Sequence, residues 1–102
     1  MSLNIIIPCY NESMRLPFNK YLDFLKLNKQ VKIIFVDDGS TDNTKNLVNK
    51  LSNKFPKQIK ILSYKKNKGK GNAVRDGFLY AVHENMSGNL AYLDADLSTS
   101  LE

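Results

Sequence analysis

The run VKIIFVDDGS, residues 31–40, decides the fold. Its apolar part, Val31–Val36, is rich in β-branched side chains and is continuous rather than alternating. This pattern is typical of a strand that is covered on both faces, as in a parallel sheet. The run then breaks into Asp37 and Asp38, and Gly39 permits a tight turn after them. A buried strand that turns sharply towards a helix is the repeating unit of an α/β fold.

Outward from this run, apolar strand-like stretches alternate with amphipathic helix-like segments. The expected strands are Leu3–Ile7, Val31–Val36, Gln58–Tyr64 and a fourth that begins at Asn89. The expected helices are Ser13–Leu27, Thr44–Phe55 and a third that follows the loop Lys65–Asn72. The alternation predicts stacked βαβ units, hence a mostly parallel sheet of about four strands flanked by three helices. We expect one domain, residues 1–102.

Particular residues are expected to set boundaries and contacts in this fold. Pro8 cannot donate to a sheet ladder and should end the first strand. Ser40 or Thr41 is expected to cap the helix that begins near Thr44. Gly77 in the third helix permits close approach of another backbone. The fourth strand is expected to be buried and central in the sheet.

The bulk composition is that of an ordinary globular chain, with 42% hydrophobic residues. No apolar run approaches the roughly 20 residues of a membrane-spanning helix. The first apolar stretch, Leu3–Ile7, lacks the flanking features of a secretory signal. The single cysteine, Cys9, cannot form an internal disulfide and is expected to be a small buried hydrophobe. These features favour a cytoplasmic protein.

The net charge of +5 comes from lysine, and six lysines lie between Lys57 and Lys70. Aromatic residues do not interleave with them in a stacking motif, so a nucleic-acid partner is not expected. A solvated surface explains several of these lysines. A positive field near a polyphosphate or an anionic membrane surface is the other interpretation, and both stay open.

The apolar run that begins at Asn89 breaks abruptly into two aspartates, Asp94 and Asp96. They should lie at the carboxyl end of a strand, where ligands bind in open α/β sheets. Two carboxylates separated by one residue at a strand end can bind a hard divalent cation that retains coordinated water and also binds phosphate oxygens. The pair therefore predicts a site for a hard divalent cation.

Parallel strands with right-handed crossovers bring their carboxyl ends to one edge. Pro8–Glu12, Asp37–Gly39 and Asp94–Asp96 should therefore converge. Acidic clusters at one edge repel one another unless a cation or a ligand with donors is bound. The N–H groups and lysines of the loop Lys65–Asn72 can face an anion in the same cleft. Each acidic cluster also has a structural interpretation as turn or capping residues.

Four motifs occur in the order and spacing seen in family 2 glycosyltransferases, and the chain resembles that family over essentially its whole length. The motifs are IIIPCYNE (residues 5–12), VDDGSTD (36–42), NKGKGNA (67–73) and DADLS (94–98). The last two look most like the dolichyl- and polyprenyl-phosphate sugar transferases of the family. The resemblance implies a GT-A, Rossmann-like nucleotide-binding half and sugar transfer, with inversion, from a UDP- or GDP-linked sugar. The closer likeness implies a lipid-phosphate acceptor and a full-length protein peripheral to the membrane.

The resemblance also implies roles for individual residues, carried over by motif. Pro8, Tyr10 and Glu12 would line the nucleotide pocket. Asp38 would accept hydrogen bonds from the base, and Gly69 and Lys70 would lie at the nucleotide or its diphosphate. Asp94 would contact the ribose or the metal, and Asp96 would hold Mg²⁺ or Mn²⁺.

In this family the catalytic base and the acceptor-binding elements lie well beyond the Asp-x-Asp motif. Here only Leu97–Glu102 follow it, so the base is expected beyond Glu102. We therefore interpret the chain as the sugar-donor-binding portion of a larger enzyme and expect it to transfer no sugar alone. An unfinished sheet also exposes edges that a homo-oligomer can cover.

Three other classes of protein compete with the transferase interpretation. A non-catalytic nucleotide- or phosphate-binding module stays open. An Asp-x-Asp phosphatase of the haloacid-dehalogenase type would carry the motif after its first strand, whereas here it follows the fourth. A dinucleotide-binding domain needs its glycine fingerprint after the first strand, but Gly69 and Gly71 follow the third, and Val74 replaces the last glycine.

Overall fold

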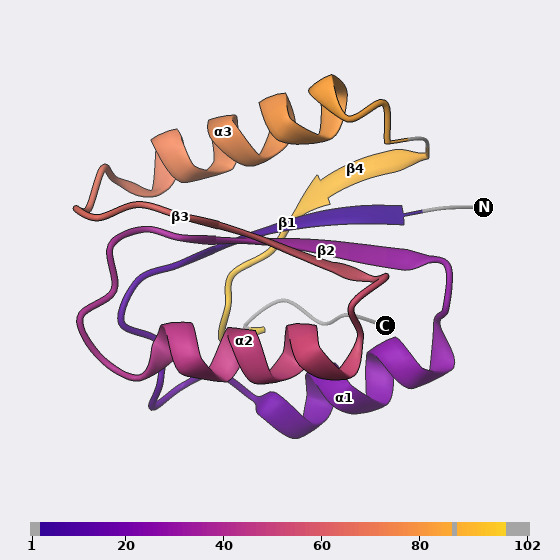
Figure 1. Ribbon diagram of the computed structural model, residues 1–102, viewed down its shortest axis with the longest axis horizontal. Coiled ribbons are helices and arrows are strands. Elements are labelled where there is room, and N and C mark those ends of the chain that lie inside the picture. The colour runs from indigo at the N-terminus through magenta and orange to yellow at the C-terminus, as the bar shows by residue number, and fades with distance from the viewer. Residues whose placement is uncertain (1–2, 87, 98–102) are drawn as a thin grey trace.

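A computed structural model describes residues 3–86 and 88–97. Its four strands are all parallel and lie in the order β3-β2-β1-β4 (Figure 1). The strands are β1 (Leu3–Cys9), β2 (Val31–Asp37), β3 (Ile59–Ser63) and β4 (Asn89–Tyr92), and the helices are α1 (Phe18–Leu27), α2 (Thr44–Lys54) and α3 (Lys70–His83). The predicted α/β fold of four strands and three helices is confirmed.

The fold has three layers, with α1 and α2 on one face of the sheet and α3 on the other (Figure 1). Successive residues of a strand point to opposite faces, so Ile33 and Phe35 belong to one core and Ile34 to the other. Both cores are closed to solvent, which explains why the apolar run of β2 is continuous rather than alternating.

The larger core lies between the sheet and the helices α1 and α2. Tyr21 of α1 and Val48 of α2 are both fully buried there. The rings of Tyr21 and Phe35 meet edge to face, with their centroids 5.5 Å apart. This aromatic contact packs α1 against strand β2 at the centre of the sheet.

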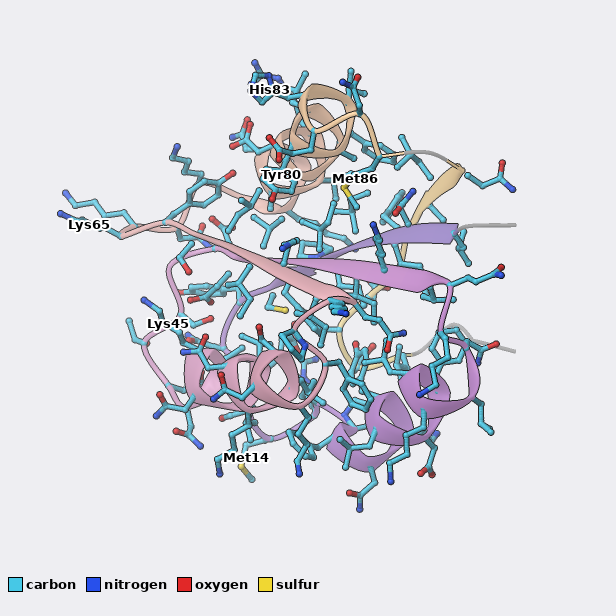
Figure 2. All side chains as sticks on the ribbon, turned by 45° about the vertical axis from the view of Figure 1, so that its right-hand side comes forward. Met14, Lys45, Lys65, Tyr80, His83 and Met86 are labelled. Carbon is cyan, nitrogen blue, oxygen red and sulfur yellow. The ribbon has the colours of Figure 1, made fainter. Side chains whose placement is uncertain are left out.

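The smaller core lies under α3, and the helix positions that face the sheet most closely carry small residues. Ala73, Gly77 and Ala81 face the sheet, and a Cβ added at Gly77 would lie 2.5 Å from Cγ2 of Ile6. The close approach expected at Gly77 is therefore to a side chain of β1, not to another backbone. Figure 2 shows Tyr80 and Met86 between α3 and the sheet and His83 on the outer side of the helix.

Two predicted boundaries were wrong because of proline. Strand β1 continues through Pro8 to Cys9. Alternate residues of a parallel strand bond to the same neighbouring strand, and the carbonyl of Ile6 accepts a hydrogen bond from Leu93 on the β4 side. The nitrogen of Pro8 therefore also points to the β4 side. Because β4 has already ended at Tyr92, the missing N–H of Pro8 costs the sheet no hydrogen bond. Helix α1 begins at Phe18 rather than Ser13, because Pro17 disfavours helical backbone in the residue before it.

The third helix also begins earlier than predicted, at Lys70, so the second glycine of its loop lies within the helix. Val82, although apolar, is 65% exposed. The buried positions Ala73, Gly77 and Ala81 recur every four residues, and Val82 is rotated by one residue out of that row.

The expectation of a buried, central fourth strand was wrong. In the described residues, β4 is an edge strand that pairs only with β1, and three of its four residues are exposed. Tyr92 is 53% exposed and Leu90 37%. No helix in the described part of the chain has both the length and the apolarity to cross a bilayer.

Candidate functional site

Three loops meet at the carboxyl edge of the sheet and enclose a pocket of about 310 Å³. They follow β1, β2 and β4, and the loop after β3 closes the fourth side. The pocket is lined by Pro8, Cys9, Tyr10, Glu12, Asp38, Asn67, Gly69, Lys70, Asp94 and Ala95. All seven residues singled out as nucleotide-binding lie in this lining, whereas Asp96 is outside it. The convergence expected from parallel topology is present.

The carboxylate of Asp38 is almost wholly buried, at 2% exposure, and it faces the glycine loop, residues 66–69. Its oxygens accept hydrogen bonds from the backbone N–H of Lys68 at 2.6 Å and of Gly69 at 2.9 Å. The side-chain amide of Asn67 donates to the same carboxylate at 3.0 Å. The anion that faces these N–H groups is thus the chain's own aspartate, a contact between distant loops that the sequence pattern did not indicate.

Gly39 makes this docking sterically feasible. Its φ is +75°, and a Cβ there would lie 2.5 Å from the backbone nitrogen of Asn67 and 2.6 Å from the carbonyl carbon of Lys66. Gly69 has a φ of +98° immediately before α3. The two turns therefore pack backbone against backbone, and α3 begins beside the pocket.

The loop after β1 is bonded to the loop after β2 by a second network. The Asn11 amide oxygen accepts from the N–H of Thr41 at 2.8 Å, and the N–H of Asn11 donates to Ser40 Oγ at 3.0 Å. Glu12 N–H donates to Thr44 Oγ1 at 2.8 Å. Ser40 or Thr41 was predicted to cap α2, but the N-cap is Asn43, which makes no side-chain cap bond. Their hydroxyl and amide groups hold the first loop instead.

Asp42 completes this network. Its carboxylate accepts from Ser13, with Oγ at 2.8 Å, and from the backbone and hydroxyl of Thr44. Burial raises the pKa of this carboxyl, but the bonds from Thr44 and Ser13 outweigh burial and lower the pKa to about 2. Asp42 is therefore ionised at neutral pH.

Lys70 and Asp94 form an ion pair across the mouth of the pocket. The distance from Lys70 Nζ to Asp94 Oδ1 is 2.5 Å, and both side chains are about half exposed, at 57% and 44%. The hydrogen bond to Asp94 raises the pKa of Lys70, against a smaller opposing effect of burial. The ammonium also lies 5.9 Å from the centre of the Tyr92 ring. Asp94 thus already faces a positive charge in this structure.

Among residues 3–86 and 88–97, no group of three or more His, Cys, Asp or Glu side chains is arranged to hold a metal ion. A metal ion bound by Asp94 and Asp96 would therefore have no third carboxylate, histidine or cysteine ligand from the described residues. Such a pair of carboxylates fits Mg²⁺ or Mn²⁺ bound together with phosphate oxygens and water rather than in an all-protein cage. The ammonium at Asp94 shows that this carboxylate can accept a cation from the pocket side. Ser98, the last residue of the fourth motif, lies outside the described residues.

Two other lining residues have structural partners. Glu12 pairs with Arg15 at 2.8 Å, and its side chain is only 18% exposed. Cys9 is buried at 1% exposure, as expected. Burial, with Asp37 and Glu12 nearby, raises the pKa of the Cys9 thiol well above its usual range, so the thiol stays protonated. Cys9 therefore packs in the floor of the pocket and is not an activated nucleophile.

The fold is similar to those of two solved glycosyltransferases. Mannosyltransferase PcManGT from Pyrobaculum calidifontis, in complex with GDP-Man and Mn²⁺, superposes with a TM-score of 0.69 at 22% identity over 92% of this chain and 27% of that one. TarS 1–349 of S. aureus, in complex with UDP-GlcNAc, gives 0.62 at 23% identity over 94% and 27%. These similarities establish the Rossmann-like GT-A architecture.

Curated relatives are longer proteins. A dolichyl-phosphate β-glucosyltransferase of Dictyostelium discoideum is 43% identical over 86 residues, which cover 76% of this chain and 26% of that protein. The Drosophila melanogaster protein of the same name is 36% identical over 97% of this chain and 32% of its own length. The chain thus spans a third or less of these relatives. A family model, glycosyl transferase family 2, matches residues 4–101. Because that match spans nearly the whole chain, the protein belongs to glycosyl transferase family 2.

Proposed function

We propose that residues 1–102 are the sugar-donor-binding portion of an inverting glycosyltransferase that uses a UDP- or GDP-linked sugar. The observation that carries this proposal is the shared pocket: Asp38 and Asp94 come from two different loops, Lys70 is the first residue of α3, and all three line one cavity. The names of the relatives support a lipid phosphate, dolichyl or polyprenyl, as the acceptor. The catalytic base and the acceptor site then belong to the part of the enzyme beyond Glu102.

The proposed nucleotide site uses both walls of the pocket. Pro8, Tyr10 and Glu12 form the wall for the nucleoside on the β1 side. Asp38 already accepts three hydrogen bonds, and a carboxylate has about four acceptor positions, so one remains for a base N–H. Base recognition at Asp38 therefore depends on how the glycine loop is docked.

The diphosphate is assigned to the side of the pocket that carries Lys70 and Asp94. In this assignment the Lys70 ammonium leaves Asp94 and pairs with a phosphate oxygen, while Asp94 and Asp96 hold Mg²⁺ or Mn²⁺. Support comes from PcManGT, which was solved with GDP-Man and Mn²⁺. When bound, the metal ion supplies positive charge to the departing nucleoside diphosphate. Lys70 adds a second, fixed charge on the helix side.

The acceptor is assigned to a membrane surface at which the full-length enzyme works from the cytoplasm. The lysines near the pocket favour this arrangement, since Lys65, Lys66 and Lys68 are all exposed on the loop after β3. Figure 2 shows Lys65 projecting from the end of that loop, clear of the fold. A basic rim of this kind attracts both anionic lipid headgroups and a lipid phosphate.

Ligand-dependent thermal unfolding tests the proposal. UDP or GDP at about ten times its dissociation constant, with Mn²⁺ or Mg²⁺, should raise the melting temperature by about 5–10 °C. Without metal the shift should be much smaller, and Asp96→Asn should abolish the metal-dependent part. Asp23→Asn, on the exposed side of α1, is the matched control and should behave like the wild type.

Three outcomes would each contradict part of the proposal. Equal stabilisation by vanadate or inorganic phosphate, with no preference for a nucleotide, would favour a phosphatase. Nucleotide binding with no metal dependence would favour a non-catalytic binding module. Transfer of labelled sugar by the 102-residue chain alone would refute the assignment of the base to a later segment.

A further inference from the structure

The hydroxyl of Tyr21 connects α1 to the loop that carries the two aspartates. Tyr21 is fully buried, and its Oη donates a hydrogen bond of 2.9 Å to the backbone oxygen of Ala95. Ala95 lies between Asp94 and Asp96 and is itself 2% exposed. Tyr21 does not line the pocket, so this contact reaches the aspartate loop from the core beneath it.

The aspartate loop, residues 93–97, has left the sheet ladder where Tyr21 reaches it. Strand β4 ends at Tyr92, and the N–H of Leu93 makes one further bond to Ile6, at 3.1 Å. A turn then closes with the N–H of Leu97 donating to the backbone carbonyl oxygen of Asp94 at 2.9 Å, and Leu97 has a φ of +56°. The hydroxyl of Tyr21 is bonded to the middle of this turn.

Tyr21 is well suited to hold a backbone group in place. Its ring is locked edge to face against Phe35, and a tyrosine has only two side-chain torsions to order. Burial raises its pKa, and Cys9, Asp96 and Glu12 raise it further, so the phenol stays a donor at all physiological pH values. Since the site is closed to solvent, water cannot replace the hydroxyl if it is removed.

We propose that Tyr21 is a positioning residue, which sets the relative placement of Asp94 and Asp96 by holding the carbonyl between them. The proposal rests on the proposed function, because it assigns to this pair a divalent cation bound with a nucleoside diphosphate. Substitution of groups that orient metal ligands without touching the metal typically lowers metal affinity about 10–100-fold. Tyr21 acts in this way through the backbone.

The test compares Tyr21→Phe with Val48→Ala in the same core. Val48 is fully buried on α2 and is not part of the pocket lining, so we expect its truncation to lower stability without a selective effect on the aspartate loop. Mn²⁺ affinity is measured by electron paramagnetic resonance with saturating UDP and, separately, GDP. Amide hydrogen exchange at Leu97 is measured without ligand. Tyr21→Phe should weaken Mn²⁺ binding about tenfold. It should also accelerate amide exchange at Leu97, relative to exchange at Val36, by about tenfold or more. Val48→Ala should leave both the Mn²⁺ affinity and the ratio of Leu97 to Val36 exchange rates unchanged.

The two readouts separate failure of this inference from failure of the proposed function. Mn²⁺ binding that is equal in the wild type and Tyr21→Phe would overturn the inference and leave the function intact. Absence of Mn²⁺ binding in the wild type with both nucleotides would refute the function and, with it, the assignment of a metal to Asp94 and Asp96. Leu97 exchange then decides the structural part alone: selective acceleration supports positioning by Tyr21, and unchanged exchange overturns it.

Discussion

Asp38 is the residue on which the docking of the glycine loop depends. Asp38→Asn keeps the shape but turns one acceptor into an NH₂ group, which would face the donors Gly69 N–H and Asn67 Nδ2. We expect a loss of about 2 kcal/mol in the free energy of unfolding, since buried donors lose their acceptor. Urea unfolding measures this loss, and the Lys68 and Gly69 amides should exchange faster. An unchanged exchange rate at Gly69 would show that the loop docks without Asp38.

Asp42 makes the link between the first two loops dependent on pH. Its pKa is about 2 in the folded chain and near 4 in the unfolded chain, so the unfolded state binds its proton first as pH falls. The stabilisation is therefore full above about pH 5 and is lost as pH falls from about 4 towards 2. Because Asp42 is largely exposed, its contribution is about 1 kcal/mol or less. The stability difference between wild type and Asp42→Asn should shrink from pH 6 to pH 3, and a constant difference would contradict this account.

Among the elements, α3 depends on close packing at Gly77. In Gly77→Ala the new methyl group would meet Ile6 Cγ2 at 2.5 Å, which must be relieved by a shift of the helix or of Ile6. We expect a destabilisation of about 1–3 kcal/mol despite the better helix propensity of alanine. Gly71→Ala is the matched control in the same helix, because its Cβ meets nothing within 4 Å, and it should be neutral or stabilising. Thermal unfolding of both variants checks this contrast, and equal effects would contradict it.

The elements were predictable where local pattern and tertiary packing agree. The continuous apolar run of β2 predicted a doubly covered strand, and α2 begins at Thr44 as predicted. The errors lie where contacts distant in sequence override the local pattern. Pro8 stays in β1 because its neighbour β4 is short, and Ser40 bonds to Asn11 rather than capping a helix. The docking of Asp38 on Lys68 could not be derived, since it joins residues 30 apart.

The location of the pocket was more predictable than the hydrogen bonds inside it. Parallel topology brings the carboxyl ends of the strands to one edge regardless of which side chains follow them. The seven nucleotide-binding residues implied by the family resemblance accordingly lie in the pocket lining, which also contains Cys9, Asn67 and Ala95. Which carboxylate bonds to which loop depends on distances that topology leaves open. The bond from Tyr21 to Ala95 could not be predicted, because nothing in a helical pattern indicates where a buried hydroxyl finds its acceptor.

For the molecule as a whole, stability should fall from the centre of the sheet to its β4 edge. Strands β1 and β2 are paired on both sides and almost wholly buried, whereas β4 pairs only with β1 in the described residues and is mostly exposed. Amide exchange should therefore be slowest in β2, and Ala91 and Leu93, whose N–H groups face β1, should exchange through local opening at a much lower free energy than global unfolding. If the pocket binds a nucleotide with Mn²⁺, the ligand should slow exchange at Leu93 and Leu97 while leaving the edge position Leu90 nearly unchanged. Uniform protection across all four strands would show instead that the sheet opens only as a whole, and that the aspartate loop is as firmly held as the core.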